Sequence, residues 1–230
     1  MEILIIRHGD PDYSIDSLTE KGWKEAQLLS DKLEKMEISA FYCSPLGRAK
    51  DTAAPTLEKM NREAKIVPWL EEIDDDCRDF LPSYWTSVEE YYSKDDWYKT
   101  DLMQKTDAKK VCDFVATELD KLLAEYGYVH EGNLFRVERE NHDRIVLFCH
   151  YGISGAILSH LTGISPVLYW QHFVAAPTSI TTIVTEEREP GIAAFRMTAY
   201  GDTGHLYVAG EEPAFAARFC ECYSDDTRHN

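Results

Sequence analysis

Two short, almost wholly apolar segments limit the fold of this chain more than any other feature. EILII (2–6) leads into Arg7-His8-Gly9, and IVLFC (145–149) leads into His150-Tyr151-Gly152. Apolar runs of this length are typical of strands buried on both faces, as in a parallel sheet covered by helices. Ligands of such sheets bind outside the carboxyl ends of the strands. The sequence therefore predicts that His8 and His150 meet at one edge of a sheet.

The rest of the chain alternates between strand and helix patterns. Further strands are predicted at 39–43, 65–70, 179–186 and 193–200, and helices at 19–36, 46–60, 106–126 and 153–162. Thr19 is the expected N-cap of the first helix, and Pro68 indicates that 65–70 lies at an edge or ends early. Alternating strands and helices predict a three-layer α/β/α fold with a mostly parallel central sheet.

Two segments interrupt this alternation. Residues 74–103 are rich in acidic and aromatic residues and predict an irregular or helical insertion, and 128–143 is predicted to be irregular and charged. The chain of 230 residues, 44% of them hydrophobic, suits a single domain over 1–230 that carries this insertion. The aromatic residues of the insertion either line the site or pack its own core: Trp85, Tyr91, Tyr92, Trp97 and Tyr98.

Composition excludes several classes of partner. The formal net charge of −17 repels nucleic acid. The longest apolar stretches are too short to span a membrane, and no basic-then-apolar leader is expected before them. The six cysteines are scattered, as expected of reduced thiols in a cytoplasmic protein. Cys220 and Cys222 form a C-x-C pair without a second pair, so no metal site is predicted there, and the sequence indicates no oligomeric state.

The polar residues at the predicted sheet edge suit phosphoryl transfer. A neutral imidazole such as His8 can attack phosphorus and form a covalent intermediate. Arg7, Arg48 and His150 can bind the equatorial oxygens, and either Glu71 or Glu72 can protonate the leaving oxygen. Each residue alone also has a purely structural explanation. Their joint position at strand ends and helix starts favours a shared site.

The ordered motifs resemble the histidine phosphatase superfamily, which includes phosphoglycerate mutase-like enzymes. They read LIIRHG (4–9), LTEKGWKEA (18–26), SPLGRAKDTA (44–53), LEE (70–72) and FCHYG (148–152), with looser likeness in APTSI (176–180) and GDTGHL (201–206). The resemblance implies a phosphoglycerate mutase-like fold, His8 as the phosphorylated histidine, Arg7, Arg48 and His150 as phosphoryl ligands, and Glu72 as the acid. It also implies catalysis without metal or cofactor on a small phosphorylated substrate.

Departures from the pattern favour hydrolysis over isomerisation. Where mutases commonly carry a small hydroxyl residue and an asparagine after R-H-G, this chain has Pro11 and Ser14, and the loop between Ser14 and Leu18 is much shorter. We therefore expect a phosphomonoester hydrolase. A phosphoglycerate mutase or other phosphotransferase is the alternative enzyme, and a phosphate-binding regulatory module without turnover is the alternative of another class.

Overall fold

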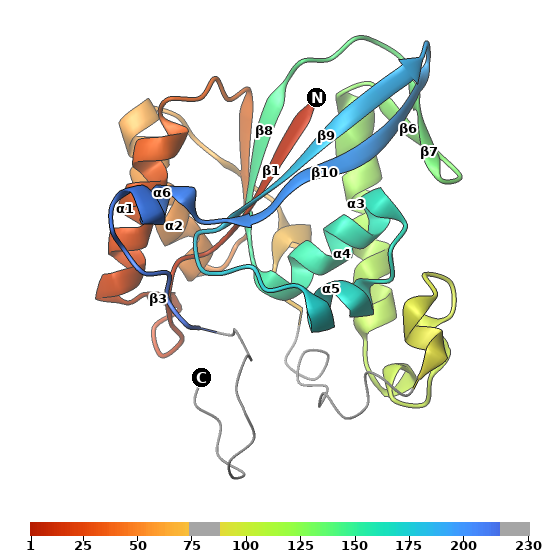
Figure 1. Cartoon of the computed structure of the whole chain (residues 1–230), viewed down its shortest axis with the longest axis horizontal. Coiled ribbons are helices and arrows are strands. Elements are labelled where there is room, and N and C mark those ends of the chain that lie inside the picture. Colours follow the sequence, from red (N-terminus) through yellow and green to blue (C-terminus); the bar gives the residue numbers. More distant parts are fainter. Residues whose placement is uncertain (74–87, 217–230) are drawn as a thin grey trace.

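The computed structural model describes residues 1–73 and 88–216 and contains one eight-stranded sheet in the order β5-β4-β8-β1-β9-β10-β7-β6 (Figure 1). Its first half is parallel: β5 (Lys65–Ile66), β4 (Ala40–Cys43), β8 (Arg144–Cys149) and β1 (Glu2–Arg7). The two apolar segments are thus adjacent central strands, as predicted. The α/β class is also confirmed.

The second half of the sheet is antiparallel. It consists of β9 (Ile180–Glu189), β10 (Ile192–Asp202), β7 (Leu134–Val137) and β6 (Tyr128–Glu131). The prediction that 128–143 is irregular was wrong over 128–137, where β6 and β7 form a hairpin around Gly132-Asn133. Gly132 has φ 69°, a conformation that glycine adopts without the steric penalty of a Cβ.

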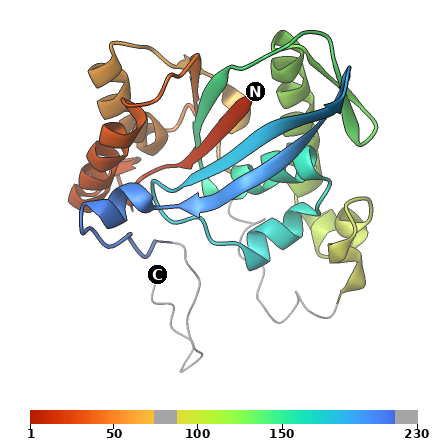
Figure 2. The same cartoon turned by 45° about the horizontal axis from the view of Figure 1, so that its top comes forward.

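Helices cover both faces of the sheet (Figure 2). Strand alternation sends Leu4 and Ile6 towards α1 (Glu20–Leu33) and α2 (Gly47–Met60), where they join one buried apolar cluster. Ile3 and Ile5 face the other cluster, which includes residues of α3 (Ala108–Glu125), α4 (Tyr151–Thr162) and α5 (Pro166–His172). The three-layer arrangement is therefore as predicted, and α6 (Gly204–Val208) packs against α1.

Local signals account for several element boundaries. The Thr19 side chain accepts a hydrogen bond from Gly22 N and caps α1 as predicted. The extended segment predicted over 65–70 is shorter, because a 3₁₀ turn over Pro68–Leu70 follows the two residues of β5. A small hairpin of β2 (Pro11–Asp12) and β3 (Ser17–Leu18) lies between β1 and α1. No helix of the described residues has the length and hydropathy that a membrane span requires.

The insertion is partly described. Residues 74–87, including Trp85, lie outside the described residues. From 88 the chain forms 3₁₀ turns at Glu89–Tyr92, Trp97–Lys99 and Met103–Lys105. Tyr91 and Trp97 are buried in the core beside α5 and α4, whereas Tyr92 is 54% exposed. Of the two alternatives for these aromatic side chains, lining the site or packing a core, Tyr91 and Trp97 therefore follow the second.

Candidate active site

The candidate site lies where β1 and β8 end side by side. The two strands pair in register up to Arg7 and Cys149, and the ladder continues with a hydrogen bond of 3.0 Å from His8 N to Cys149 O. The imidazole rings of His8 and His150 then lie with their centroids 5.1 Å apart. Both histidines are buried, His8 with 3% of its surface exposed and His150 with none.

The backbone around His8 fixes its ring. Nδ1 lies 2.7 Å from the Gly9 carbonyl oxygen. A carbonyl oxygen can only accept, so Nδ1 carries the proton and the lone pair is on Nε2. Gly9 N in turn donates to the Thr52 hydroxyl on α2 at 2.8 Å. The loop that carries the candidate nucleophile is thus bonded to the helix that carries Arg48.

Ser44 orients His150. The sequence predicted no separate role for Ser44, which is the first residue of the motif SPLGRAKDTA (44–53). The Ser44 hydroxyl lies 2.7 Å from His150 Nε2, and Ser44 N donates to Phe148 O at the end of β8. Ser44 itself is fully buried. Its place directly after strand 39–43 was the available signal, because that strand lies beside β8.

Arg7 is a buried cation under the site. Its Nη1 donates to Ala175 O at 2.6 Å, and its guanidinium carbon lies 5.6 Å from the centroid of the Tyr151 ring. Burial lowers the pKa of Arg7, which the nearby Tyr13 and Glu72 partly offset. An arginine nevertheless stays protonated in a protein. The side chain therefore supplies a desolvated positive charge at the end of β1.

Arg48 stands in the first turn of α2 and pairs with a loop carboxylate. Its Nη1 donates to Asp16 Oδ1 at 2.6 Å, and Asp16 Oδ2 accepts from Gly47 N at 2.6 Å. Desolvation acts against ionisation of Asp16, but the hydrogen bonds from Gly47 and Arg48 outweigh it and lower the pKa of Asp16. Asp16 was not identified from the sequence; its backbone has φ 47°, and the loop offers no periodic signal.

Glu72 and Glu71 occupy different environments. Glu72 Oε1 accepts from Ile73 N and Ile153 N, each at 2.9 Å, and Oε2 accepts from Gly152 N at 3.1 Å. The carboxyl group thus sits on the amino end of α4, beside His150. Glu71 is exposed. The geometry therefore places Glu72, and not Glu71, next to the histidine pair.

Residues of the two looser motifs, APTSI (176–180) and GDTGHL (201–206), contact the backbone around His8 or one another. Thr178 N donates to Arg7 O at 3.1 Å and to His8 O at 3.2 Å, with the residue at φ 56°. Its hydroxyl lies 3.1 Å from Nε2 of His205, and burial lowers the pKa of His205 to about 4. His205 is therefore neutral near pH 7.

The structure brings together the five candidate residues that the sequence predicted: Arg7, His8, Arg48, Glu72 and His150. Their roles stay predictions.

Solved structures share this fold. Mycobacterial glucosyl-3-phosphoglycerate phosphatase superposes with a TM-score of 0.63 at 16% identity, over 88% of this chain and 99% of that one. A phosphoserine phosphatase from Entamoeba histolytica gives a TM-score of 0.62 at 20% identity, over 89% and 98%. At these identities the likeness establishes the architecture.

Curated relatives match over different lengths. Phosphoserine phosphatase 1 of Hydrogenobacter thermophilus is 26% identical over 90% of this chain and 97% of its own length. A 2,3-bisphosphoglycerate-dependent phosphoglycerate mutase of Thermoplasma acidophilum is 33% identical, but over only 30% of this chain and 40% of the mutase.

The family model of the histidine phosphatase superfamily, branch 1, matches residues 3–198. This range begins within β1 and ends within β10, and it contains all five candidate residues. By that match, and by the shared architecture, the chain belongs to the histidine phosphatase superfamily.

Proposed function

We propose that this protein is a phosphomonoester hydrolase that works through a phosphohistidine on His8. The observation that carries the proposal is the hydrogen bond of 2.7 Å from His8 Nδ1 to Gly9 O. It leaves the lone pair on Nε2, as a nucleophile requires, in a ring packed against His150. The substrate class is a small phosphorylated metabolite.

Two buried arginines supply the charge that a transferring phosphoryl group needs. Nε of Arg7 and Nε of Arg48 are buried and have no hydrogen-bond partner among the residues that the structure describes. Buried donors are normally satisfied, so such groups call for an explanation. A phosphoryl group bound by both guanidinium groups provides one.

The reaction then has two steps. His8 Nε2 attacks phosphorus, the P–O ester bond breaks, and Glu72 gives its proton to the departing alkoxide oxygen. Water next attacks the phosphohistidine, Glu72 takes a proton from that water, and inorganic phosphate leaves. His150, held by Ser44, donates a hydrogen bond to the phosphoryl oxygens in both steps. No metal takes part in this scheme, so turnover should persist in EDTA.

Two observations favour a hydrolase over a mutase. The phosphoserine phosphatase relative aligns over nearly its whole length, whereas the mutase aligns over 40% of its own. The chain also departs from the mutase pattern at Pro11 and Ser14. A mutase remains the second candidate because the aligned 80 residues are 33% identical. An assay that measures phosphate release and isomerisation in parallel separates the two.

Trapping of the intermediate tests the mechanism. Rapid acid-free quenching with labelled substrate should yield a base-stable, acid-labile phosphoenzyme in the wild type and none in His8→Ala. A screen over phosphorylated metabolites, with and without EDTA, identifies the substrate. Label on serine or cysteine, or activity that EDTA removes and a divalent ion restores, would refute the proposal. Folded but inactive protein across the whole panel would favour a regulatory module.

The proposed location is the cytoplasm. Cys43 and Cys149 are buried and free, and burial raises the pKa of Cys43 to about 12. Such thiols behave as small apolar side chains and suit a reducing compartment. Fractionation of the cells that produce the protein tests this directly.

A further inference from the structure

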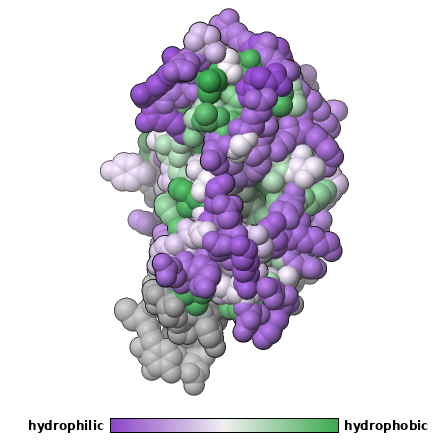
Figure 3. Space-filling view, turned by 90° about the vertical axis from the view of Figure 1, so that its right-hand side faces the viewer, coloured by the Kyte–Doolittle hydropathy of each residue, from purple (hydrophilic) through white to green (hydrophobic). Residues whose placement is uncertain are grey.

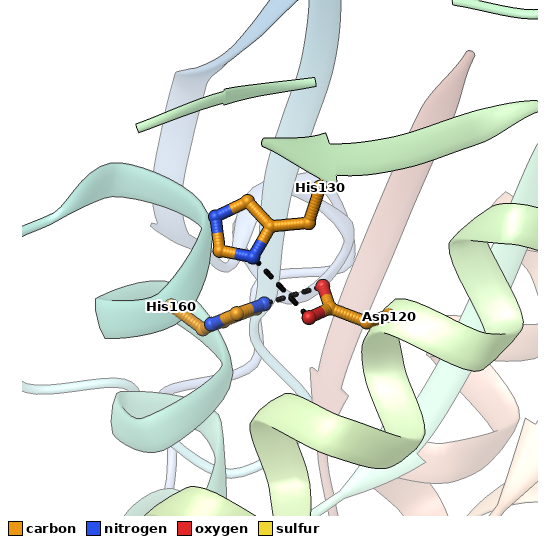
Figure 4. Close-up of side chains that lie close together, drawn as sticks. All are labelled: Asp120, His130 and His160. Atoms are coloured by element: carbon orange, nitrogen blue, oxygen red, sulfur yellow. Dashed lines mark hydrogen bonds and ion pairs between the residues drawn. The ribbon is translucent and has the colours of Figure 1, made fainter. Parts of the chain in front are cut away.

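A cluster of two histidines and one aspartate lies away from the candidate active site. Asp120 on α3, His130 on β6 and His160 on α4 point towards one another in Figure 4, and one ligand atom from each lies within 4.8 Å of the others. His160 is near the carboxyl end of α4, whereas Glu72 binds the amino end of that helix. At a rise of 1.5 Å per residue, about 15 Å separates His160 from His150.

The contacts within the cluster match the donor set of a transition metal. Asp120 Oδ1 lies 2.6 Å from His160 Nε2, and Asp120 Oδ2 lies 3.2 Å from His130 Nδ1. Zinc binds imidazole nitrogen and carboxylate oxygen at about 2.0–2.2 Å, so tetrahedral ligand atoms stand about 3.3 Å apart. The two histidine nitrogens therefore need to approach by at most about 1.5 Å.

The surroundings hold the rings and leave room for an ion. The His130 ring stacks on Phe135 at 4.8 Å between centroids and meets the His160 ring at 4.7 Å. A cavity of about 510 Å³ borders both histidines. The three side chains are between 13% and 32% exposed, so a hydrated ion can reach them. Figure 3 views the molecule from the side that carries the β6–β7 hairpin, where hydrophilic residues predominate.

We propose that Asp120, His130 and His160 form a binding site for one divalent transition metal ion of the zinc type, with water from the cavity completing its coordination. On binding, each histidine nitrogen that now faces Asp120 gives its lone pair to the ion, and its proton moves to the other ring nitrogen or to solvent. The three ligands come from three elements, and β6 is the edge strand of the sheet. The ion therefore clamps the edge hairpin to α3 and α4. It takes no part in the proposed catalysis.

The site escapes sequence analysis because its residues have no motif spacing. Asp120 and His130 are ten positions apart and belong to different elements, and His160 follows thirty residues later. The competing explanation is a hydrogen-bonded bridge in which both imidazoles donate to the carboxylate. That bridge uses the same two imidazoles and the same carboxylate, so only a binding experiment separates the two explanations.

Metal titration of the full chain is the test. Protein stripped with a chelator and then freed of it should bind Zn²⁺ with 1:1 stoichiometry in a calorimetric titration. His130→Ala, His160→Ala and Asp120→Asn should each weaken binding by at least about tenfold. His142→Ala is the matched control, because His142 is an exposed histidine that pairs with a carboxylate, Glu140, outside the cluster; its affinity should equal that of the wild type.

Two further measurements separate loss of this site from unfolding of a variant and from metal binding elsewhere in the chain. Co²⁺ bound to the wild type should show visible d–d absorption without a thiolate charge-transfer band, which would instead indicate cysteine ligands such as Cys220 and Cys222. Saturating Zn²⁺ should raise Tm of the wild type and of His142→Ala by roughly 5 °C or more, and not that of His160→Ala. Absence of saturable binding, a thiolate band, or equal affinity in all variants would overturn the proposal.

Discussion

Replacement of Glu25 by glutamine should remove a defined part of the pH dependence of stability. Glu25 lies on α1 with no exposed surface, and its two carboxylate oxygens accept from Asp10 N at 3.0 Å and Ala214 N at 2.8 Å. It thereby joins the loop that follows His8 to the segment beyond α6. Burial, which the two hydrogen bonds only partly offset, raises the pKa of Glu25 from 4.5 to about 6.

The sign and size of this pH dependence follow from the linkage between proton binding and folding. A carboxyl with a raised pKa binds its proton more tightly in the folded state, so its contribution is complete below about pH 4.5 and is lost as the pH rises through 6. The shift of about 1.5 units corresponds to about 2 kcal/mol of free energy of unfolding. More than half of this free energy, roughly 1 kcal/mol, remains to be lost between pH 5 and pH 8.

Urea unfolding followed by tryptophan fluorescence measures this loss. The difference in free energy of unfolding, wild type minus Glu25→Gln, should fall by roughly 1 kcal/mol from pH 5 to pH 8, since the glutamine does not titrate. The sequence pI of about 4.8 sets the lower pH limit. Glu58→Gln, at an exposed position on α2, is the control and should show a constant difference. A constant or rising difference for Glu25→Gln would refute the reasoning.

Five further substitutions test the candidate site. Arg48→Lys should lower kcat/KM at least about tenfold while Tm changes little, because lysine cannot bind a phosphoryl group in bidentate fashion; near-normal kcat/KM would exclude the clamp. Asp16→Asn removes the charge that competes for Arg48, so the Ki of inorganic phosphate should fall by up to about fivefold, the limit for a partly exposed ion pair. Gly152→Ala puts a methyl group 2.7 Å from Glu72 Oε1 and should lower kcat at least about tenfold in a folded protein. Glu72→Gln should reduce kcat by about 10²–10⁴ for an alkyl phosphate and less for a nitrophenyl phosphate, whereas Glu71→Gln should be mild with both; the reverse ranking would exchange their roles.

The sequence predicted the meeting of His8 and His150 because buried parallel strands have a simple signature. Two apolar runs that each end in a polar residue are typical of strands in a parallel sheet, whose carboxyl ends lie at one edge. The motif glycines also have a physical reason. A Cβ on Gly22 would lie 2.2 Å from the Asp10 carbonyl oxygen, so only glycine lets α1 pack against the loop after His8.

Other features depend on tertiary contacts that no local pattern encodes. The partnership of Asp16 with Arg48 requires a loop residue at positive φ, and the Ser44–His150 contact requires β4 to lie beside β8. The hairpin over 128–137 was missed although Gly132-Asn133 is a turn signal between YVHE and LFRV, because the charged run over 138–143 led the whole segment 128–143 to be interpreted as irregular. An apolar run also does not state whether its neighbour is parallel, so the antiparallel pairing of β1 with β9 was not anticipated.

The strand order has a consequence for how the protein emerges from the ribosome. β8 inserts between β1 and β4, so the first third of the chain cannot form a continuous sheet until residue 149 has been synthesised. Contacts of such long sequence separation form slowly because a large loop must close first. The nascent chain therefore exposes two unpaired apolar strands during most of translation, and chaperone capture is most valuable in that interval. The candidate active site, which needs both His8 and His150, can form only once β8 is in place.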